Sequence, residues 1–190
     1  MQVTLKDHTL DPEHKIGLAA AKCYDGGRDR ESNVRRTRGC KDKGHLSTLR
    51  FAYATFDISG ISRVCSHQLV RMAHAGILQR SQRFCREDGI EYVKPAGFDT
   101  IPPALQGRWD ALLAEANSLY GELVDGKHMR AEDARYVFPQ SCVTELSICL
   151  NFQGYRDLLK ARTSKAAQWE VRAVALEIQR QLAEIAPGLF

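Results

Sequence analysis

The clearest pattern in the chain is a run of apolar positions at helical spacing over residues 109–123. Trp, Leu, Ala and Tyr side chains there fall at positions i, i+3, i+4, i+7, i+10, i+11 and i+14, which places them on one face of a helix. A second apolar stripe over residues 171–185 predicts a last helix, with Ser164 as its N-terminal cap. We expect the first of these helices to be core scaffold without a chemical role.

The remaining segments alternate between strand-like and helix-like patterns. Asp11 and Pro12 mark a helix start, because aspartate is a common cap and proline fits the first helical position. Gly60 is expected to end a strand rich in aromatic and β-branched residues. The expected strands are residues 1–5, 49–59 and 143–150, and the further expected helices are residues 12–23, 61–72, 131–136 and 152–162. This order of elements predicts an α+β architecture.

Residues 28–43 are charged and almost free of large apolar side chains. Their cations are Arg28, Arg30, Arg35, Arg36, Arg38, Lys41 and Lys43. Two interpretations fit this composition: a mobile solvated loop, or a basic flap that closes over an anionic ligand.

Composition narrows the class of protein. The chain has 190 residues with 44% hydrophobic residues, which fits one globular domain over residues 1–190. The net charge of +4 is small, so it favours a small anionic ligand over a nucleic acid polymer. Six cysteines show neither C-x-x-C pairs nor zinc-finger spacing, so we expect reduced thiols and no metal site. With no apolar leader and no membrane-length apolar run, we expect a cytoplasmic protein without a membrane partner.

One stretch carries candidate chemistry. It runs from Gln68 and Arg71 to Ser81, Gln82 and Arg83. Arginine presents a planar fork of donors that matches phosphate oxygens, and a glutamine amide can bind the edge of a base. Gln68 and Arg71 are three residues apart, so on a helix they share a face. The stretch therefore predicts a nucleotide site.

Several motifs occur in an order that resembles a known family. They are Ala20-Ala21-Lys22-Cys23-Tyr24, Gly44-His45-Leu46-Ser47, Phe56-Asp57-Ile58, Ser62-Arg63, His67-Gln68-Leu69-Val70-Arg71, Ser81-Gln82-Arg83-Phe84, Ala134-Arg135-Tyr136-Val137-Phe138-Pro139, Asn151 and Ala167-Gln168-Trp169-Glu170. Together they resemble the flavin-dependent thymidylate synthases of the ThyX type, over most of the chain.

The chain departs from that family at its signature, which is Arg-His-Arg, seven residues, then Ser. Arg71-Met72-Ala73 and Ser81 stand at these positions, so the histidine and the second arginine are missing. Asn151-Phe152-Gln153 stands in place of Asn-Ala-Arg, Gln79 in place of a glutamate, and Arg50-Phe51 in place of a Glu-His pair. Most of these departures lie where the family holds its flavin.

The resemblance implies a fold and a reaction. The fold would be ThyX-like, a mixed sheet flanked by helices, assembled as a homotetramer. The reaction would be methylation of C5 of a uridine monophosphate, with FAD as cofactor and with methylenetetrahydrofolate and NADPH as co-substrates. C5 becomes nucleophilic when the ring gains anionic character, which a nearby guanidinium favours. By resemblance Arg162 is that catalytic guanidinium; a cation opposing the dipole at a helix C-terminus is the structural alternative.

The resemblance also implies the binding residues. The expected substrate contacts are Gln68, Arg71, Gln79, Arg80, Ser81, Gln82, Arg83, Arg135 and Arg162. The expected flavin contacts are His45, Ser47, Arg71, Met72, Ala73, Gln79, Asn151, Gln153 and Asp157. We expect Ser81 to contact phosphate and not to act as a nucleophile, because no base is evident to activate it. His67 and His74 are left outside the expected site.

Several alternatives stay open from the sequence. The amide of Gln79 adds donors where the family has an acceptor, so the substrate could be UMP, as in a UMP-methylating branch in nucleoside-antibiotic biosynthesis, or dUMP, as in an ordinary thymidylate synthase. The lost cations could be replaced by arginines of residues 28–43. A non-catalytic nucleotide-binding relative is a second class of function. An RNA-binding module is a third, supported by the basic segment alone.

Overall fold

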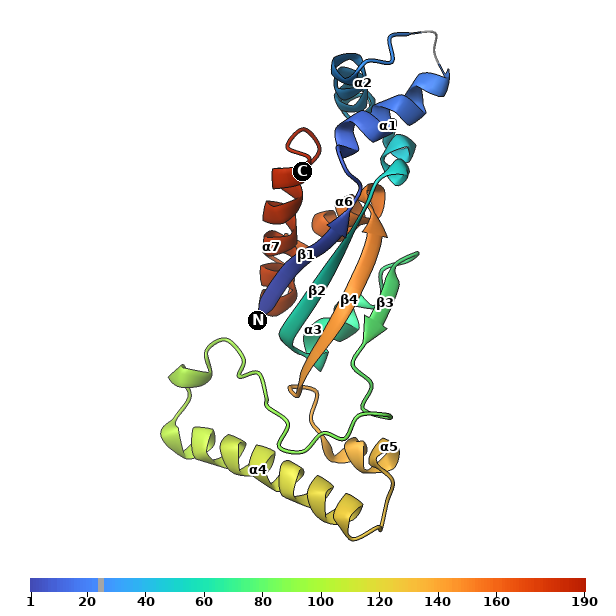
Figure 1. Cartoon of the computed structure of the whole chain (residues 1–190). Helices are drawn as coiled ribbons and strands as arrows, with labels where there is room; N and C mark the ends of the chain where they lie inside the picture. The colour runs from blue at the N-terminus through green and yellow to red at the C-terminus, as the bar shows by residue number, and fades with distance from the viewer. Residues whose placement is uncertain (24–25) are drawn as a thin grey trace. The chain divides into compact units, whose positions relative to one another are not determined.

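The computed structural model describes residues 1–23 and 26–190, and these residues form two compact units (Figure 1). The sheet unit contains residues 2–58, 68–78 and 147–190. The α4 unit contains Met1 and residues 59–67 and 79–146. Tyr24, the last residue of the first family motif, lies outside the described residues, and the expectation of one catalytic domain over residues 1–190 stays a prediction.

Four strands form one sheet in the order β1-β2-β4-β3. They are β1 (Gln2–His8), β2 (Tyr53–Ser62), β3 (Gly76–Gln79) and β4 (Val143–Asn151). Ala54, Phe56 and Ile58 of β2 are buried at every second position, as expected where one face of a sheet covers a core. With helices beside the sheet, this composition agrees with the α+β class (Figure 1).

The expected mixed sheet is wrong in one respect, because neighbouring strands run antiparallel throughout (Figure 1). Parallel neighbours need a connection that crosses back over the sheet. The chain instead leaves the sheet at the end of β1, forms helices there, and enters β2 at the same end. Strand β2 therefore runs beside β1 in the opposite direction (Figure 1).

Helices α6 (Phe152–Arg162) and α7 (Trp169–Ile185) pack against each other, and α7 packs against β1. The apolar stripe expected for the last helix is confirmed; its buried members are Val171, Val174, Ala175, Ile178 and Leu182. The expected cap is wrong. Gln168 caps α7, its side chain accepting from the backbone N–H groups of Glu170 and Val171, because the helix begins five residues after Ser164.

Tyr155 fixes α6 against the sheet. Its ring is buried and meets Phe56 edge-on, with ring centroids 5.5 Å apart. Its hydroxyl lies 3.1 Å from the carbonyl oxygen of Ala54 on β2 and 3.2 Å from that of Ile148 on β4. Burial raises the pKa of Tyr155 above its usual value, so this hydroxyl stays a hydrogen-bond donor at neutral pH.

Residues 28–43 are neither a loop nor a flap, since they contain helix α2 (Arg30–Asp42), which packs on α1 (Pro12–Ala20). The buried face of α2 consists of Asn33, Thr37 and Cys40. At Gly17 the helices approach so closely that a Cβ would lie 2.0 Å from the carbonyl oxygen of Asn33. The apolar periodicity is missing because this contact uses small and polar side chains.

Two further boundaries differ from the sequence expectation. Gly60 does not end β2; it lies within the strand at a positive φ of 66°, which glycine adopts without strain. Helix α3 (Arg63–Leu69) is shorter than expected. Arg71 therefore lies beyond the helix, and the expectation that it shares a helical face with Gln68 is wrong.

The α4 unit contains the long helix α4 (Pro103–Asp125), which packs on α5 (Ala131–Ala134) and on the 3-10 turn Arg135–Val137. The expected apolar helix is confirmed, but only part of its stripe is buried, at Leu113, Ala116 and Tyr120. Leu105, Leu112 and Leu119 are 47%, 63% and 40% exposed. None of the helices found in residues 1–23 and 26–190 is long and apolar enough to cross a bilayer.

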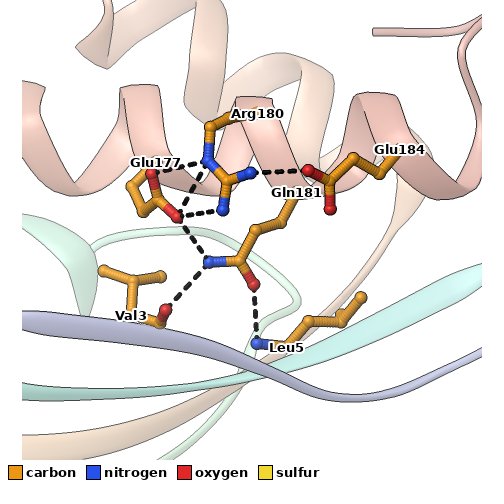
Figure 2. Close-up of polar contacts among 6 residues, drawn as sticks. All are labelled: Val3, Leu5, Glu177, Arg180, Gln181 and Glu184. Atoms are coloured by element: carbon orange, nitrogen blue, oxygen red, sulfur yellow. Dashed lines mark hydrogen bonds and ion pairs between the residues drawn. The ribbon is translucent and has the colours of Figure 1, made fainter.

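The free edge of β1 is capped by one side chain from α7 (Figure 2). The Gln181 amide nitrogen donates to the carbonyl oxygen of Val3, and its amide oxygen accepts from the backbone N–H of Leu5, both at 2.8 Å. Glu177 accepts a further hydrogen bond from Gln181, and its hydrogen bond with Arg180 lowers its pKa. Gln181 therefore joins α7 to the edge strand.

We expect Gln181→Ala to lower the free energy of unfolding by about 1–3 kcal/mol, because it leaves two backbone groups of β1 without their partner. Urea unfolding followed by circular dichroism measures the change. Arg180→Ala is the matched control on the same helix, and it should cost less than about 1 kcal/mol because its ion pairs are exposed. Equal losses in the two variants would contradict this account of Gln181.

Candidate functional site

A cavity of about 310 Å³ lies at the N-terminus of α6, within the sheet unit. We call it the α6 pocket. It is lined by Arg50, Met72, Ala73, His74, Leu150, Asn151, Gln153, Gly154 and Asp157. Five of these residues, Met72, Ala73, Asn151, Gln153 and Asp157, are flavin contacts expected from the sequence. The fold thus brings together segments about 80 residues apart.

The N-terminus of α6 shapes one wall of this pocket. The Asn151 side chain caps the helix by accepting from the backbone N–H of Gly154 at 2.8 Å. The Gln153 amide nitrogen donates to Asp157 at 2.9 Å. The amide oxygen of Gln153 is buried and has no hydrogen-bond partner among the described residues. Since buried polar atoms are nearly always satisfied, this oxygen is suited to accept from a bound molecule.

Arg162 lies in the last turn of the same helix, close to Gln68. Its Nη1 donates to the side-chain oxygen of Gln68 at 3.3 Å, and its Nη2 to the backbone oxygen of Gln68 at 3.4 Å. The Nε of Arg162 is buried and lacks a partner in the described part of the chain. The guanidinium is therefore held at one edge and keeps donor capacity for a ligand.

His45 and Ser47 are not among the residues that line the α6 pocket. His45 lines a separate cavity of about 440 Å³ beside α2, together with Ser32, Arg35, Arg36 and Lys43, while Ser47 is exposed. Most arginines of α2 are already engaged: Arg35 with Glu31, Arg36 with the carbonyl groups of Gly17 and Gly27, and Arg38 with Glu13.

Gln79 and Arg80 lie in the α4 unit with their side chains occupied. The Gln79 amide nitrogen donates to the hydroxyl groups of Ser66 and Thr144 at 3.0 and 3.2 Å. Arg80 pairs with Glu87 at 3.0 Å, and this hydrogen bond raises the pKa of the guanidinium. Both residues thus have partners within their own unit.

Two of the expected substrate contacts, Arg83 and Arg135, are bonded to Glu132 in the first turn of α5. Arg83 Nε lies 2.6 Å from the Glu132 carboxylate, and Arg135 Nε donates to the Glu132 carbonyl oxygen at 2.9 Å. The Ser81 hydroxyl accepts from the backbone N–H of Arg83 at 3.2 Å. Two guanidinium groups from separate segments are therefore bonded to one residue, Glu132, while the Ser81 hydroxyl is bonded to the backbone of Arg83.

Gln82 differs from its neighbours because it is buried. Its amide nitrogen lies 3.6 Å from the sulfur of Cys142, so its side chain faces the interior of the α4 unit. Burial raises the pKa of the Cys142 thiol, which keeps that cysteine protonated and unreactive at neutral pH.

The sequence analysis missed three residues that the fold places at these clusters. Arg50 and His74 line the α6 pocket, and Glu132 holds Arg83. Arg50 had a sequence signal, since it stands where the resembled family has a glutamate. His74 had none, because its role depends on a turn at a positive φ of 63°.

Comparison with known proteins identifies the family. The profile of the thymidylate synthase complementing protein family matches residues 4–188. The chain is 38% identical over 201 residues to a flavin-dependent thymidylate synthase of Geobacter sulfurreducens, covering 100% of this chain and 85% of the relative.

Two archaeal relatives carry the same description. A flavin-dependent thymidylate synthase of Pyrococcus furiosus is 34% identical over 97% of this chain and 80% of its own length. That of Thermococcus onnurineus is 36% identical over 97% of this chain and 79% of its own. Residues 4–188, which include every cluster described above, therefore make this chain a member of the thymidylate synthase complementing protein family, the ThyX-type flavin-dependent thymidylate synthases.

Proposed function

We propose that this chain methylates C5 of dUMP, using FAD with methylenetetrahydrofolate and NADPH as co-substrates. The observation that carries the proposal is that one helix, α6, carries both the proposed cofactor site and the proposed catalytic residue. The α6 pocket lies at its N-terminus, and Arg162, hydrogen-bonded to Gln68, lies in its last turn. Because both belong to the sheet unit, one rigid element fixes them. The family uses FAD with folate and NADPH as co-substrates.

The polar groups of the α6 pocket fit the hydrogen-bonding groups and the diphosphate of a flavin cofactor. The amide oxygen of Gln153 is buried and lacks a partner among the described residues, and a flavin offers N–H and O–H donors. The backbone N–H groups at the N-terminus of a helix favour anionic groups, which the flavin diphosphate supplies. Bound there, FAD would supply the hydride-transfer chemistry of the reaction.

Arg162 would act on the uracil ring. Its guanidinium, oriented by Gln68, would stabilise the negative charge that develops on the ring when C5 attacks the one-carbon unit. The free Nε and the long contacts to Gln68 leave Arg162 able to bind a carbonyl oxygen. Gln68 is the positioning residue in this account.

Ser81, Arg83 and Arg135 would bind the nucleotide phosphate. Guanidinium groups form paired hydrogen bonds with phosphate oxygens, and a hydroxyl adds a further donor. Because the Ser81 hydroxyl has no neighbouring base among its described partners, it would bind and not attack. A phosphate would compete with Glu132 for Arg83.

The sugar specificity depends on Gln79. The amide donors that would suit a ribose 2′-hydroxyl are used by Ser66 and Thr144, which leaves the amide oxygen as an acceptor, as in a glutamate. This supports dUMP as the main substrate and makes UMP methylation, as in nucleoside-antibiotic biosynthesis, the alternative outcome.

Turnover of dUMP and UMP under identical conditions tests the proposal. With FAD, methylenetetrahydrofolate and NADPH present, we expect methylation of dUMP and a lower kcat/KM for UMP, measured by chromatography of the products. A preference for UMP would identify the alternative substrate. Binding of dUMP without methylation of either nucleotide would overturn the enzymatic proposal and favour a nucleotide-binding relative.

Arg162→Gln should lower kcat for dUMP about 10²–10³-fold, because it removes a donor that stabilises charge in the transition state. Initial rates at saturating dUMP measure this loss. Lys160→Gln is the control, since it removes an exposed cation from the same helix. An unchanged kcat in Arg162→Gln would reduce Arg162 to a cation that opposes the helix dipole.

We also propose that the chain assembles as a homotetramer through α4. Leu105, Leu112 and Leu119 are exposed at seven-residue spacing, the repeat by which two helices pack along a common seam. A second copy of α4 would remove this apolar surface from water, which is favourable in proportion to its area.

Leu112→Glu should lower the oligomer mass measured by light scattering, because it places a charge on the proposed seam. Leu10→Glu is the matched control, since Leu10 is exposed but lies in the sheet unit. Wild-type protein with the mass of one chain would overturn the homotetramer, and an intact tetramer of Leu112→Glu would exclude α4 as the interface.

A further inference from the structure

The two residues that stand at the positions of the family's missing histidine and arginine line the α6 pocket. Met72 and Ala73 stand where a histidine and an arginine are usual, and both face this cavity. If the pocket binds an anionic group, two positive charges are absent from the turn after α3. The same cavity therefore has to provide groups that bind this anion from its other lining residues.

Arg50 and His74 are two such groups, and both line the same cavity. Arg50 lies in the 3-10 turn Leu46–Phe51 and is exposed. Within residues 1–23 and 26–190 its guanidinium forms no ion pair or hydrogen bond, whereas those of Arg35, Arg36 and Arg38 are each engaged by another residue. A guanidinium that is free and faces a cavity is available to a ligand.

The turn that carries His74 has an unusual conformation. Its φ of 63° lies in the left-handed region, which costs a residue other than glycine conformational energy. Met72 and Ala75 close this turn by backbone hydrogen bonds, from the Met72 N–H to Leu69 and from the Ala75 N–H to Met72. The turn thus places His74 among the residues that line the cavity.

The remaining wall also favours an anion. The N-terminus of α6 provides the positive end of a helix of 11 residues. Asp157 is the one carboxylate among the lining residues, and it already accepts from the Gln153 amide. The buried amide oxygen of Gln153 has no partner among the described residues, so the cavity also suits a hydrogen-bond donor, as a molecule such as a dinucleotide would provide.

We propose that Arg50, with His74, binds the diphosphate of FAD and so replaces the charges lost at Met72 and Ala73. This inference rests on the proposed function, because it concerns the flavin of that reaction. It assigns a cofactor-binding role to a position where the resembled family has an acidic residue. It also explains why the arginines of α2 are not needed for this purpose.

The dissociation constants of flavins test this role of Arg50 without an assay of enzymatic activity. FAD and riboflavin are each titrated into the full chain and followed by flavin fluorescence. Riboflavin has the same ring but no phosphate. We expect Arg50→Gln to raise the Kd for FAD about 10-fold or more, as for loss of a charge-assisted contact, and to leave the Kd for riboflavin unchanged.

A matched control and a rescue make the test specific. Arg108→Gln removes an exposed arginine in the α4 unit, so the Kd for FAD should not change. Adding Ala73→Arg to Arg50→Gln returns a guanidinium to the same pocket, and the affinity for FAD should recover. Because Arg50 is exposed and has no partner in the described residues, all variants should keep the thermal unfolding midpoint of the wild type.

The outcomes separate this inference from the proposed function. If wild-type protein binds FAD and Arg50→Gln binds it equally well, the role of Arg50 is overturned and the enzymatic proposal stands. If Arg50→Gln weakens FAD and riboflavin alike, Arg50 acts on the ring or on the fold and the diphosphate assignment is wrong. If wild-type protein binds neither flavin, both proposals fail.

Discussion

The contact between Tyr155 and the sheet is the constraint on which the site depends. The hydroxyl of this buried residue bridges carbonyl groups of β2 and β4, and its ring packs on Phe56. Because α6 is a short helix of 11 residues, holding its first turn against the sheet restrains the whole helix. Gln153 near one end and Arg162 at the other therefore depend on the packing of one aromatic side chain that does not line the α6 pocket.

The arginines of the described residues differ in the partners of their guanidinium groups. Arg80 and Arg83 have carboxylate partners, and Arg38 pairs with Glu13. Arg50 has none in the described residues, and Arg162 contacts an amide. A paired guanidinium has lost part of its capacity for a new anion, whereas an unpaired one at a cavity retains it. Whether a basic side chain already has a partner is therefore a better guide to ligand binding than the number of basic residues.

The fold shows which residues surround the positions where the chain departs from the family signature. In the sequence, Met72 and Ala73 stand where the resembled family has a histidine and an arginine. In three dimensions they line one cavity with Arg50 and His74, so two other polar side chains stand beside the positions where the family's cations are missing. Gln79 shows a similar effect, because its amide nitrogen is bonded to Ser66 and Thr144 and only its amide oxygen is left for a ligand.

The sequence by itself determined the α+β class, helices α1, α4, α6 and α7, and the family, because apolar periodicity and short motifs are local properties. It also predicted five of the residues that line the α6 pocket, by resemblance. It failed at α2, whose buried face is Asn33, Thr37 and Cys40 against Gly17 and so carries no apolar stripe. Only the tertiary structure decided that Arg50 and His74 join that pocket, that Glu132 holds Arg83 and that a leucine row on α4 stays exposed, since each depends on contacts between segments distant in the chain.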